Sequence, residues 1–267
     1  MTLSITILGC GSSGGVPRVG QGWGACDPGN PRNRRRRCSI LVERTGKAGT
    51  TRVLVDTSPD LREQLLDAGV DRLDAVLFTH DHADHTHGID DLRPLVITMR
   101  RRIDVHADAR TSAVLHSRFG YAFATPPGSD YPPILREHRI VSGRMVAVDS
   151  NGGPVEAMPF DLEHGRSTAL GFRFGNVAYT PDVSAIPADA LQHLEGLDLW
   201  IVDALRPMPH PTHFSLDEAL AWIERMKPRR AVLTNLHTDL DYAALAASLP
   251  PHVAPAHDGL YLTAEGQ

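Results

Sequence analysis

The chain has 267 residues, of which 42% are apolar and 22% charged, and its formal net charge is −5. This length fits one large domain or two small ones with a substantial core, and the negative balance argues against a general nucleic-acid binder, which is usually basic. We expect neither a signal peptide nor a membrane span, because Met1 to Leu8 lack the basic start of a leader and no apolar stretch approaches the roughly 20 residues that cross a bilayer.

The cysteines give a hint about the compartment. Cys10, Cys26 and Cys38 are odd in number, and their spacing matches no CxxC zinc pair. A disulfide framework is therefore not indicated, and reduced thiols in a cytoplasmic protein are expected.

In the first half of the chain, short β-branched runs alternate with stretches of helical spacing. The glycine-rich run Gly9 to Gly15 follows the first strand, and residues 16–37 are predicted to be irregular because they are rich in Gly, Pro, Asn and Arg. The predicted strands are 4–8, 39–43, 52–56, 75–78 and 103–106, and the predicted helices are 59–68 and 91–99.

The second half continues this alternation. Residues 120–137 contain four prolines and predict a long surface loop or lid, and Ser215 with Glu218 predicts a capping box at the start of a helix. The predicted strands are 155–161, 169–174, 177–180, 199–203 and 231–233, and the predicted helices are 188–195, 215–226 and 242–249. We expect one domain over residues 1–267, of α/β class, with two mixed β-sheets sandwiched between helices.

A cluster of metal-binding side chains directly follows a predicted buried strand. His80, His82, Asp84 and His85 lie within six residues. In an extended segment His80 and His82 point the same way, and a helix that begins near Ala83 would return the other two toward the same point. Imidazoles and a carboxylate are good ligands for zinc-like ions, and manganese or iron also fit.

Further candidates follow later strands. His164, Asp182 and His237 each come after a β-run, so each fits one edge of a sheet. Because one segment supplies too few ligands for two ions, these residues would complete a two-ion site. An aspartate such as Asp182 has two oxygens and can bridge two cations.

The run Thr79 to His85, followed by Gly88, resembles the signature of the metallo-β-lactamase superfamily. The order of the later His and Asp residues matches the ligand series of that superfamily. Four further motifs make the chain similar to the branch that contains the phosphoribosyl 1,2-cyclic phosphate phosphodiesterase; they are residues 9–17, 33–39, 55–60 and 88–93.

The resemblance implies a metallo-β-lactamase fold and two divalent ions, Zn²⁺ or Mn²⁺. It also implies a dinuclear phosphodiesterase that hydrolyses a small cyclic or nucleotide-like phosphodiester through a metal-bridging hydroxide. In the implied assignment, one ion is held by His80, His82 and His164, the other by Asp84, His85 and His237, and Asp182 bridges them; Asp56 orients the histidine loop, and His213 donates a proton to the leaving group.

Two departures from the branch stand out. Relatives often carry a structural zinc on clustered cysteines near residues 21–26, whereas here only Cys26 remains, so we expect that zinc to be absent. Relatives also often have a histidine where Asn235 stands. We keep His237 as the ligand, because it is the only histidine at this strand end.

Other functions stay open at this stage. They are a thioester or lactone hydrolase, a cofactor-biosynthesis oxidoreductase, and a non-catalytic nucleotide-binding protein. His213 favours phosphodiester chemistry, since an external acid matters most for a poor alkoxide leaving group. Gly9 to Gly15 and the arginines of Arg32 to Arg37 could be structural or could contact phosphate. The expected partner is a small phosphodiester or nucleotide rather than a long nucleic acid or a membrane, and a homodimer is left open.

Overall fold

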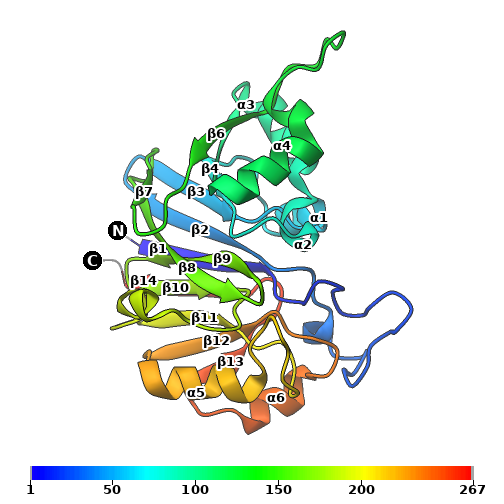
Figure 1. The fold of residues 1–267 in the computed structure, drawn as a ribbon, viewed down its shortest axis with the longest axis vertical. Helices are drawn as coiled ribbons and strands as arrows, with labels where there is room; N and C mark the ends of the chain where they lie inside the picture. The colour runs from blue at the N-terminus through cyan, green and yellow to red at the C-terminus, as the bar shows by residue number, and fades with distance from the viewer. Residues whose placement is uncertain (1, 266–267) are drawn as a thin grey trace.

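Two β-sheets lie face to face in the computed structural model, which describes residues 2–265 (Figure 1). The first sheet has the strand order β14-β1-β2-β3-β4-β5-β6, and the second has the order β13-β12-β11-β10-β9-β8-β7. The strands of the first sheet are β1 (Thr2–Gly9), β2 (Ser39–Gly46), β3 (Gly49–Val55), β4 (Ala75–Leu77), β5 (Ile103–Ala107), β6 (Leu135–Arg139) and β14 (Tyr261–Glu265). Those of the second are β7 (Val146–Val148), β8 (Val155–His164), β9 (Ser167–Phe174), β10 (Val177–Thr180), β11 (Leu199–Asp203), β12 (Arg230–Thr234) and β13 (Val253–Pro255).

Both sheets are mixed, as the sequence predicted. In the first, β14, β1, β2 and β3 pair antiparallel, whereas β3, β4, β5 and β6 pair parallel. In the second, β7 to β10 pair antiparallel and β10 to β13 pair parallel. The parallel strands place their carboxyl ends at a common edge of each sheet, and loops at such edges form the sites of many α/β proteins.

Alternation along the strands separates the apolar side chains into layers. Ile40 and Val42 of β2 face the core between the sheets, together with Phe172 of β9. Leu41 lies between those two in the chain and faces the opposite side, where it packs with Leu61 and other helix residues. This period of two is that of a strand with both faces buried.

Helices cover the two outer faces (Figure 1). The first sheet is covered by α1 (Leu61–Asp67), the short 3₁₀ helix η2 (Ile89–Leu92), α3 (Arg93–Met99) and α4 (Ala109–Phe123). The second is covered by the 3₁₀ helix η3 (Ala188–His193), α5 (Leu216–Met226) and α6 (Tyr242–Ser248). The expected capping box is confirmed at α5, where Ser215 and Glu218 each satisfy the other's backbone N–H.

Some predicted boundaries were wrong. The interval 120–137 is not one long loop, because α4 extends to Phe123 and β6 begins at Leu135. Only the proline-rich connection 124–134 projects from the body, at the top of Figure 1. The interval 188–195 forms a 3₁₀ helix, which starts after Pro187, rather than an α-helix. The edge strands β6, β7, β13 and β14 were not predicted.

A buried arginine holds the irregular N-terminal segment against the second sheet. Arg35 is 2% exposed. Its guanidinium donates to the carbonyls of Leu240 at 2.7 Å and His237 at 3.2 Å, and to Asn33 Oδ1 at 3.2 Å. Cys26 lies beside it, with its Sγ 3.9 Å from Arg35 Nη1. Hydrogen bonds from Arg35 therefore tie residues 26–35 to the chain that follows β12.

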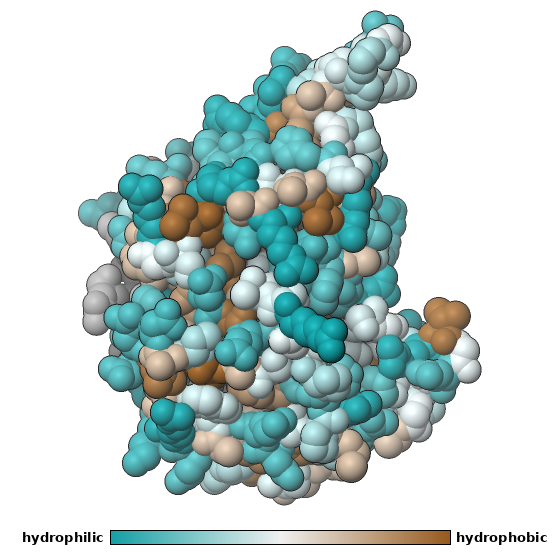
Figure 2. All heavy atoms as spheres, in the orientation of Figure 1, coloured by the Kyte–Doolittle hydropathy of each residue, from teal (hydrophilic) through white to brown (hydrophobic). Residues whose placement is uncertain are grey.

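The surface agrees with the composition. Figure 2 shows a mainly hydrophilic face on which apolar side chains form small, separate groups. Within residues 2–265, no helix is long and apolar enough to cross a membrane.

Candidate metal centre

The polar side chains of the centre stand at the carboxyl ends of strands. The segment after β4 carries His80 and His82 and turns directly into the one-turn helix α2 (Ala83–Thr86), which confirms the expected turn near Ala83. On the second sheet, β8 ends at His164 and β11 ends at Asp203, and Asp182 lies two residues beyond β10. The centre thus lies between the two sheets at one end of the sandwich.

Four predicted ligands converge on one point. One ligand atom each from His80, His82, His164 and Asp182 can be chosen so that all four lie within 4.8 Å of one another. His82 Nδ1 is 3.3 Å from His164 Nε2. His80, His164 and Asp182 are each about 2% exposed, so ordinary hydration of the histidines does not explain the cluster.

Asp182 turns its two oxygens toward different histidines. Its Oδ2 is 3.6 Å from His80 Nε2 and 3.7 Å from His164 Nε2. Its Oδ1 is 3.3 Å from His85 Nε2, and Asp84 Oδ2 lies 3.5 Å from that same nitrogen. His85, with Asp84 beside it, therefore faces a different carboxylate oxygen of Asp182 from the one that His80 and His164 face.

The donor set fits divalent cations. His80 Nε2, His85 Nε2 and Asp182 Oδ1 are buried without a hydrogen-bond partner, and such atoms are costly unless something else binds them. Ligand atoms that are about 2.0–2.1 Å from a tetrahedral zinc ion are about 3.3 Å apart. The contacts of 3.3–3.7 Å around Asp182 are close to that separation.

The pKa values of His80 and His85 are shifted in opposite directions. Burial and the neighbouring His85 lower the pKa of His80 well below its ordinary value, so His80 is neutral and has a free lone pair. Burial also lowers the pKa of His85, but the carboxylates of Asp182, Asp56 and Asp84 outweigh it and raise the pKa overall. His85 has concentrated negative charge around it, and cations would neutralise that charge.

Asp56 orients the histidine loop, as expected. Its Oδ1 accepts from Thr79 N at 2.8 Å, and its Oδ2 accepts from Thr79 Oγ1 at 2.8 Å. Oδ2 also lies 2.7 Å from His85 Nδ1, and Thr79 Oγ1 is 2.9 Å from His80 Nδ1. One fully buried carboxylate thus fixes the rings of two predicted ligands, which is the usual arrangement behind a metal-binding histidine. Asp56 has a left-handed backbone (φ 65°), which Asp tolerates better than most residues.

His213 is held by a second buried carboxylate. Its Nδ1 donates to Asp203 Oδ2 at 2.8 Å, and Asn235 Nδ2 donates to the other oxygen of Asp203 at 3.1 Å. Burial lowers the pKa of His213, but Asp203 and Asp182 outweigh it and raise the pKa to about 9. His213 Nδ1 lies 4.0 Å from Asp182 Oδ2, so the predicted acid stands beside the predicted ligands.

The ring of His237 contacts Arg18 and Asp239 in this structure. Its Nε2 is 2.5 Å from Arg18 Nη1, and its Nδ1 is 3.0 Å from Asp239 Oδ2. Both ring nitrogens are therefore engaged away from Asp182. His237 lines the same cavity as the cluster but does not join it in this structure, so its assignment as a ligand remains a prediction.

The cavity in front of the centre has a volume of about 280 Å³ and contains residues that sequence reasoning missed. Arg18 and Arg206 line it, with Ser12 and Ser13 of the glycine-rich loop and with His210. No motif indicated the two arginines, because they come from irregular segments far apart in the chain. Their convergence is visible only in the fold.

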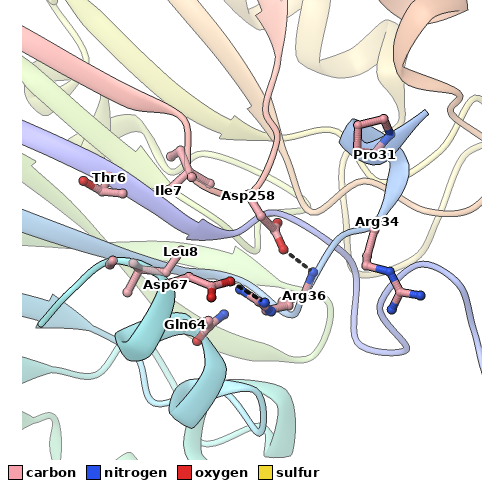
Figure 3. A pocket seen from close by; sticks show the side chains of 11 residues that line it. Thr6, Ile7, Leu8, Pro31, Arg34, Arg36, Gln64, Asp67 and Asp258 are labelled. Atoms are coloured by element: carbon pink, nitrogen blue, oxygen red, sulfur yellow. Dashed lines mark hydrogen bonds and ion pairs between the residues drawn. The ribbon is translucent and has the colours of Figure 1, made fainter. Parts of the chain in front are cut away.

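The arginines of 32–37 do not line this cavity. Arg34 and Arg36 line a separate cavity of about 300 Å³ (Figure 3). There Arg36 Nη2 pairs with Asp67 Oδ2 at 2.6 Å, and the Arg36 backbone N–H donates to Asp258 at 2.8 Å. Arg37 pairs with Asp60 at 3.1 Å. These contacts favour the structural interpretation of the arginine run.

Comparisons with known proteins agree with this geometry. A family model described as "Beta-lactamase superfamily domain" matches residues 51–235. A solved structure titled "a New Diphosphatase from the PhnP Family" is 36% identical and has a TM-score of 0.88, over 98% of this chain and 97% of that one. The chain belongs to the metallo-β-lactamase superfamily, in the branch that contains the PhnP family. The predicted superfamily, branch and fold are thereby confirmed.

Two curated proteins are also similar. An octanoyltransferase of Porphyromonas gingivalis is 34% identical over 259 residues, which are 95% of this chain and 50% of that protein. A ribonuclease Z of Bradyrhizobium diazoefficiens is 30% identical over 153 residues, which are 55% of this chain and 47% of that protein. The matches thus span about half the length of these curated relatives. The names diphosphatase and ribonuclease both describe hydrolysis of phosphorus–oxygen bonds, in agreement with the expected metal-dependent hydrolase.

Proposed function

We propose that this protein is a dinuclear metal-dependent phosphodiesterase that hydrolyses a small cyclic or nucleotide-like phosphodiester. The observation that carries the proposal is the position of Asp182 between two groups of ligands. Its Oδ2 faces His80 and His164, and its Oδ1 faces His85. This is the arrangement expected of a carboxylate that bridges two cations.

Each side of Asp182 offers an appropriate donor set. His80, His82 and His164 would hold one ion, and Asp84 with His85 would hold the other. Nitrogen and carboxylate donors suit Zn²⁺ and Mn²⁺. When bound, such ions would activate a water molecule and withdraw charge from the phosphoryl oxygens.

His213 supplies the proton for the leaving group in this proposal. Because Asp203 engages Nδ1, the other ring nitrogen, Nε2, is left for the cavity that His213 lines. Asp203 thereby fixes both the ring orientation and the tautomer, as a carboxylate does behind a general acid–base histidine. Asn235 donates to Asp203 and holds that carboxylate in turn.

The cavity gives less support to acyl-transfer chemistry. Among the described residues none of those that line it is a cysteine. Cys10 and Cys38 are buried, and burial raises the pKa of both thiols, so neither is a ready nucleophile. Thioester or lactone hydrolysis by bound ions remains the main alternative, and substrate tests separate it from the proposal.

The test uses the full chain after loading with Zn²⁺ or Mn²⁺. We expect about two ions per chain by elemental analysis and turnover of bis(4-nitrophenyl) phosphate and of cyclic ribose or nucleotide phosphodiesters. Turnover of thioesters or lactones, with none of any phosphodiester, would reverse the assignment.

The role of His213 is tested by His213→Asn. We expect kcat for phosphodiesters to fall about 10²- to 10³-fold while the metal content stays unchanged. The same substitution at His193, on the outer helix η3, is the matched control and should leave kcat unchanged. Unchanged turnover in His213→Asn would remove this residue from the mechanism.

A further inference from the structure

The metal-site cavity is lined by two positively charged side chains as well as by aspartates. Arg18 and Arg206 both line it. Among residues 2–265 neither guanidinium has a carboxylate within ion-pair distance, although most arginines near the first sheet do. Two partly buried cations that lack counter-charges favour an anionic ligand in the space they face.

Arg18 is positioned by the glycine-rich loop. Its backbone is fixed in a turn with Gly22, through N–H to carbonyl bonds of 2.8 Å and 2.7 Å. Its guanidinium lies over Gly14, where a Cβ would be only 2.2 Å from Arg18 Nε. A glycine at position 14 therefore provides the room in which this side chain reaches the cavity.

Arg206 is positioned by carbonyl groups. Its Nη2 donates to Pro209 O at 3.1 Å and its Nε donates to Met208 O at 3.3 Å. These bonds fix the plane of the guanidinium without neutralising its positive charge. The remaining N–H groups of the guanidinium stay available for a ligand.

Ser12 adds an independent observation. It lines the same cavity and is 2% exposed, and its Oγ is buried without a hydrogen-bond partner. A buried hydroxyl with no partner indicates a missing donor or acceptor. Ser12 is held beside the end of β12, because its N–H donates to Leu236 O at 3.3 Å.

We propose that Arg18, Arg206 and Ser12 form a subsite for a second phosphate group of the substrate. The inference rests on the proposed function and narrows it. The substrate is a small nucleotide-like phosphodiester that carries a second, linked phosphate group. One phosphate lies at the His and Asp cluster, and the other is bound by the two guanidiniums.

The test compares two ligands that differ by one phosphate. The dissociation constants of AMP and of non-hydrolysable α,β-methylene-ADP are measured by calorimetry on the metal-loaded full chain. We expect the diphosphate analogue to bind at least about tenfold more tightly. Arg18→Gln and Arg206→Gln should each reduce that preference by about tenfold, and the melting temperature of each variant checks that it folds.

Two further variants sharpen the result. Arg34→Gln removes one positive charge from the separate cavity of Figure 3 and should keep the full preference. Arg206→Lys keeps the positive charge but lacks the paired N–H donors of a guanidinium, so it should retain only part of the preference for the diphosphate analogue.

The binding and turnover measurements test the second-phosphate subsite and the proposed phosphodiesterase activity separately. Equal binding of the two ligands by the unmodified protein, or a full preference in both glutamine variants, would overturn the subsite even if phosphodiesters are hydrolysed. Absence of measurable binding of the analogue at millimolar concentration would overturn it as well. A protein that shows the expected preference but hydrolyses no phosphodiester would retain the subsite and lose the proposed function.

Discussion

The metal centre and the environment of Arg35 are both buried clusters of charged and polar groups, yet they differ in what they leave unsatisfied. Around Asp182, two histidine nitrogens and a carboxylate oxygen have no partner. Around Arg35, carbonyls and an amide oxygen accept from both terminal nitrogens of the guanidinium, and only its Nε lacks a partner. The difference teaches that buried polarity alone does not mark a functional site. A functional site is marked instead by buried ligand atoms that face one another without partners, because folding alone does not explain the free-energy cost of burying them.

The largest expected effect tests the unsatisfied cluster directly. Asp182→Asn keeps the shape of the side chain but removes the charge that both ligand groups share. We expect bound metal to fall below one ion per chain and kcat to fall about 10³-fold or more. Elemental analysis with turnover of bis(4-nitrophenyl) phosphate measures both. Asp189→Asn on the exposed side of η3 is the control, and equal metal content in the two variants would contradict the comparison.

A smaller loss of metal binding is expected when Asp56, which lies behind the predicted ligands, is changed. Asp56→Asn should weaken metal affinity about 10- to 100-fold, because one of the two accepting oxygens is replaced by an NH₂ group, which cannot accept from Thr79 or His85. Asn tolerates the left-handed backbone at this position, so the fold should persist. Competition with a chromogenic chelator gives the affinity. An affinity equal to that of the unmodified protein would show that the histidine loop is ordered without Asp56.

The Arg35 cluster should respond in stability rather than in metal binding. Arg35→Met removes three hydrogen bonds, to the carbonyls of Leu240 and His237 and to Asn33 Oδ1, and we expect a loss of about 3 kcal/mol in the free energy of unfolding. For a domain of this size that loss corresponds to about 6–12 °C in Tm. Thermal unfolding measures it, with exposed Arg34→Met as the control. A loss of bound metal at unchanged Tm would be the opposite of what the comparison predicts.

The smallest effect concerns pH. Burial raises the pKa of Asp258 to about 7, although the Arg36 N–H and the Cys10 N–H partly oppose it. A carboxyl group whose folded pKa is raised stabilises fully below its ordinary pKa, and that contribution is lost as the pH rises through about 7. The decrease in Tm between pH 6 and pH 8.5 should therefore be smaller in Asp258→Asn. Asp67→Asn, whose side chain is 64% exposed, should keep the original slope.

Much of the fold was predictable because its strands are long or strongly apolar. Strands β8 to β12 appear at the predicted places, since each is a β-branched or aromatic run that ends at a turn residue. Helix α4 was missed because the polar residues Thr111 and Ser112 lie on its buried face and its backbone departs from helical geometry at Phe119. The edge strands β7 and β13 have only three residues each, too few for alternation to show.

The positions of site residues were predictable where the residues directly follow strands. They were not predictable where irregular loops determine the position of a side chain. His80, His164 and Asp182 converge because the ends of β4, β8 and β10 meet at one end of the sandwich. His237 also follows a strand, but spacing cannot show that Arg18, from the irregular N-terminal segment, would lie against its ring. Arg206 is equally invisible in the sequence, since its orientation depends on two carbonyls of its own loop.

The pairing of β14 with β1 has a consequence for how the chain is made. β1 precedes the other described strands, and it pairs with β2 on one side and with β14 on the other, in register from Thr2 opposite Glu265 to Thr6 opposite Tyr261. During synthesis the edge of β1 that faces β14 therefore stays open until residues 261–265 have emerged. An open edge is a template for strand pairing with another chain. A nascent chain interrupted before residue 261 would have both sheets largely assembled and yet expose an aggregation-prone border.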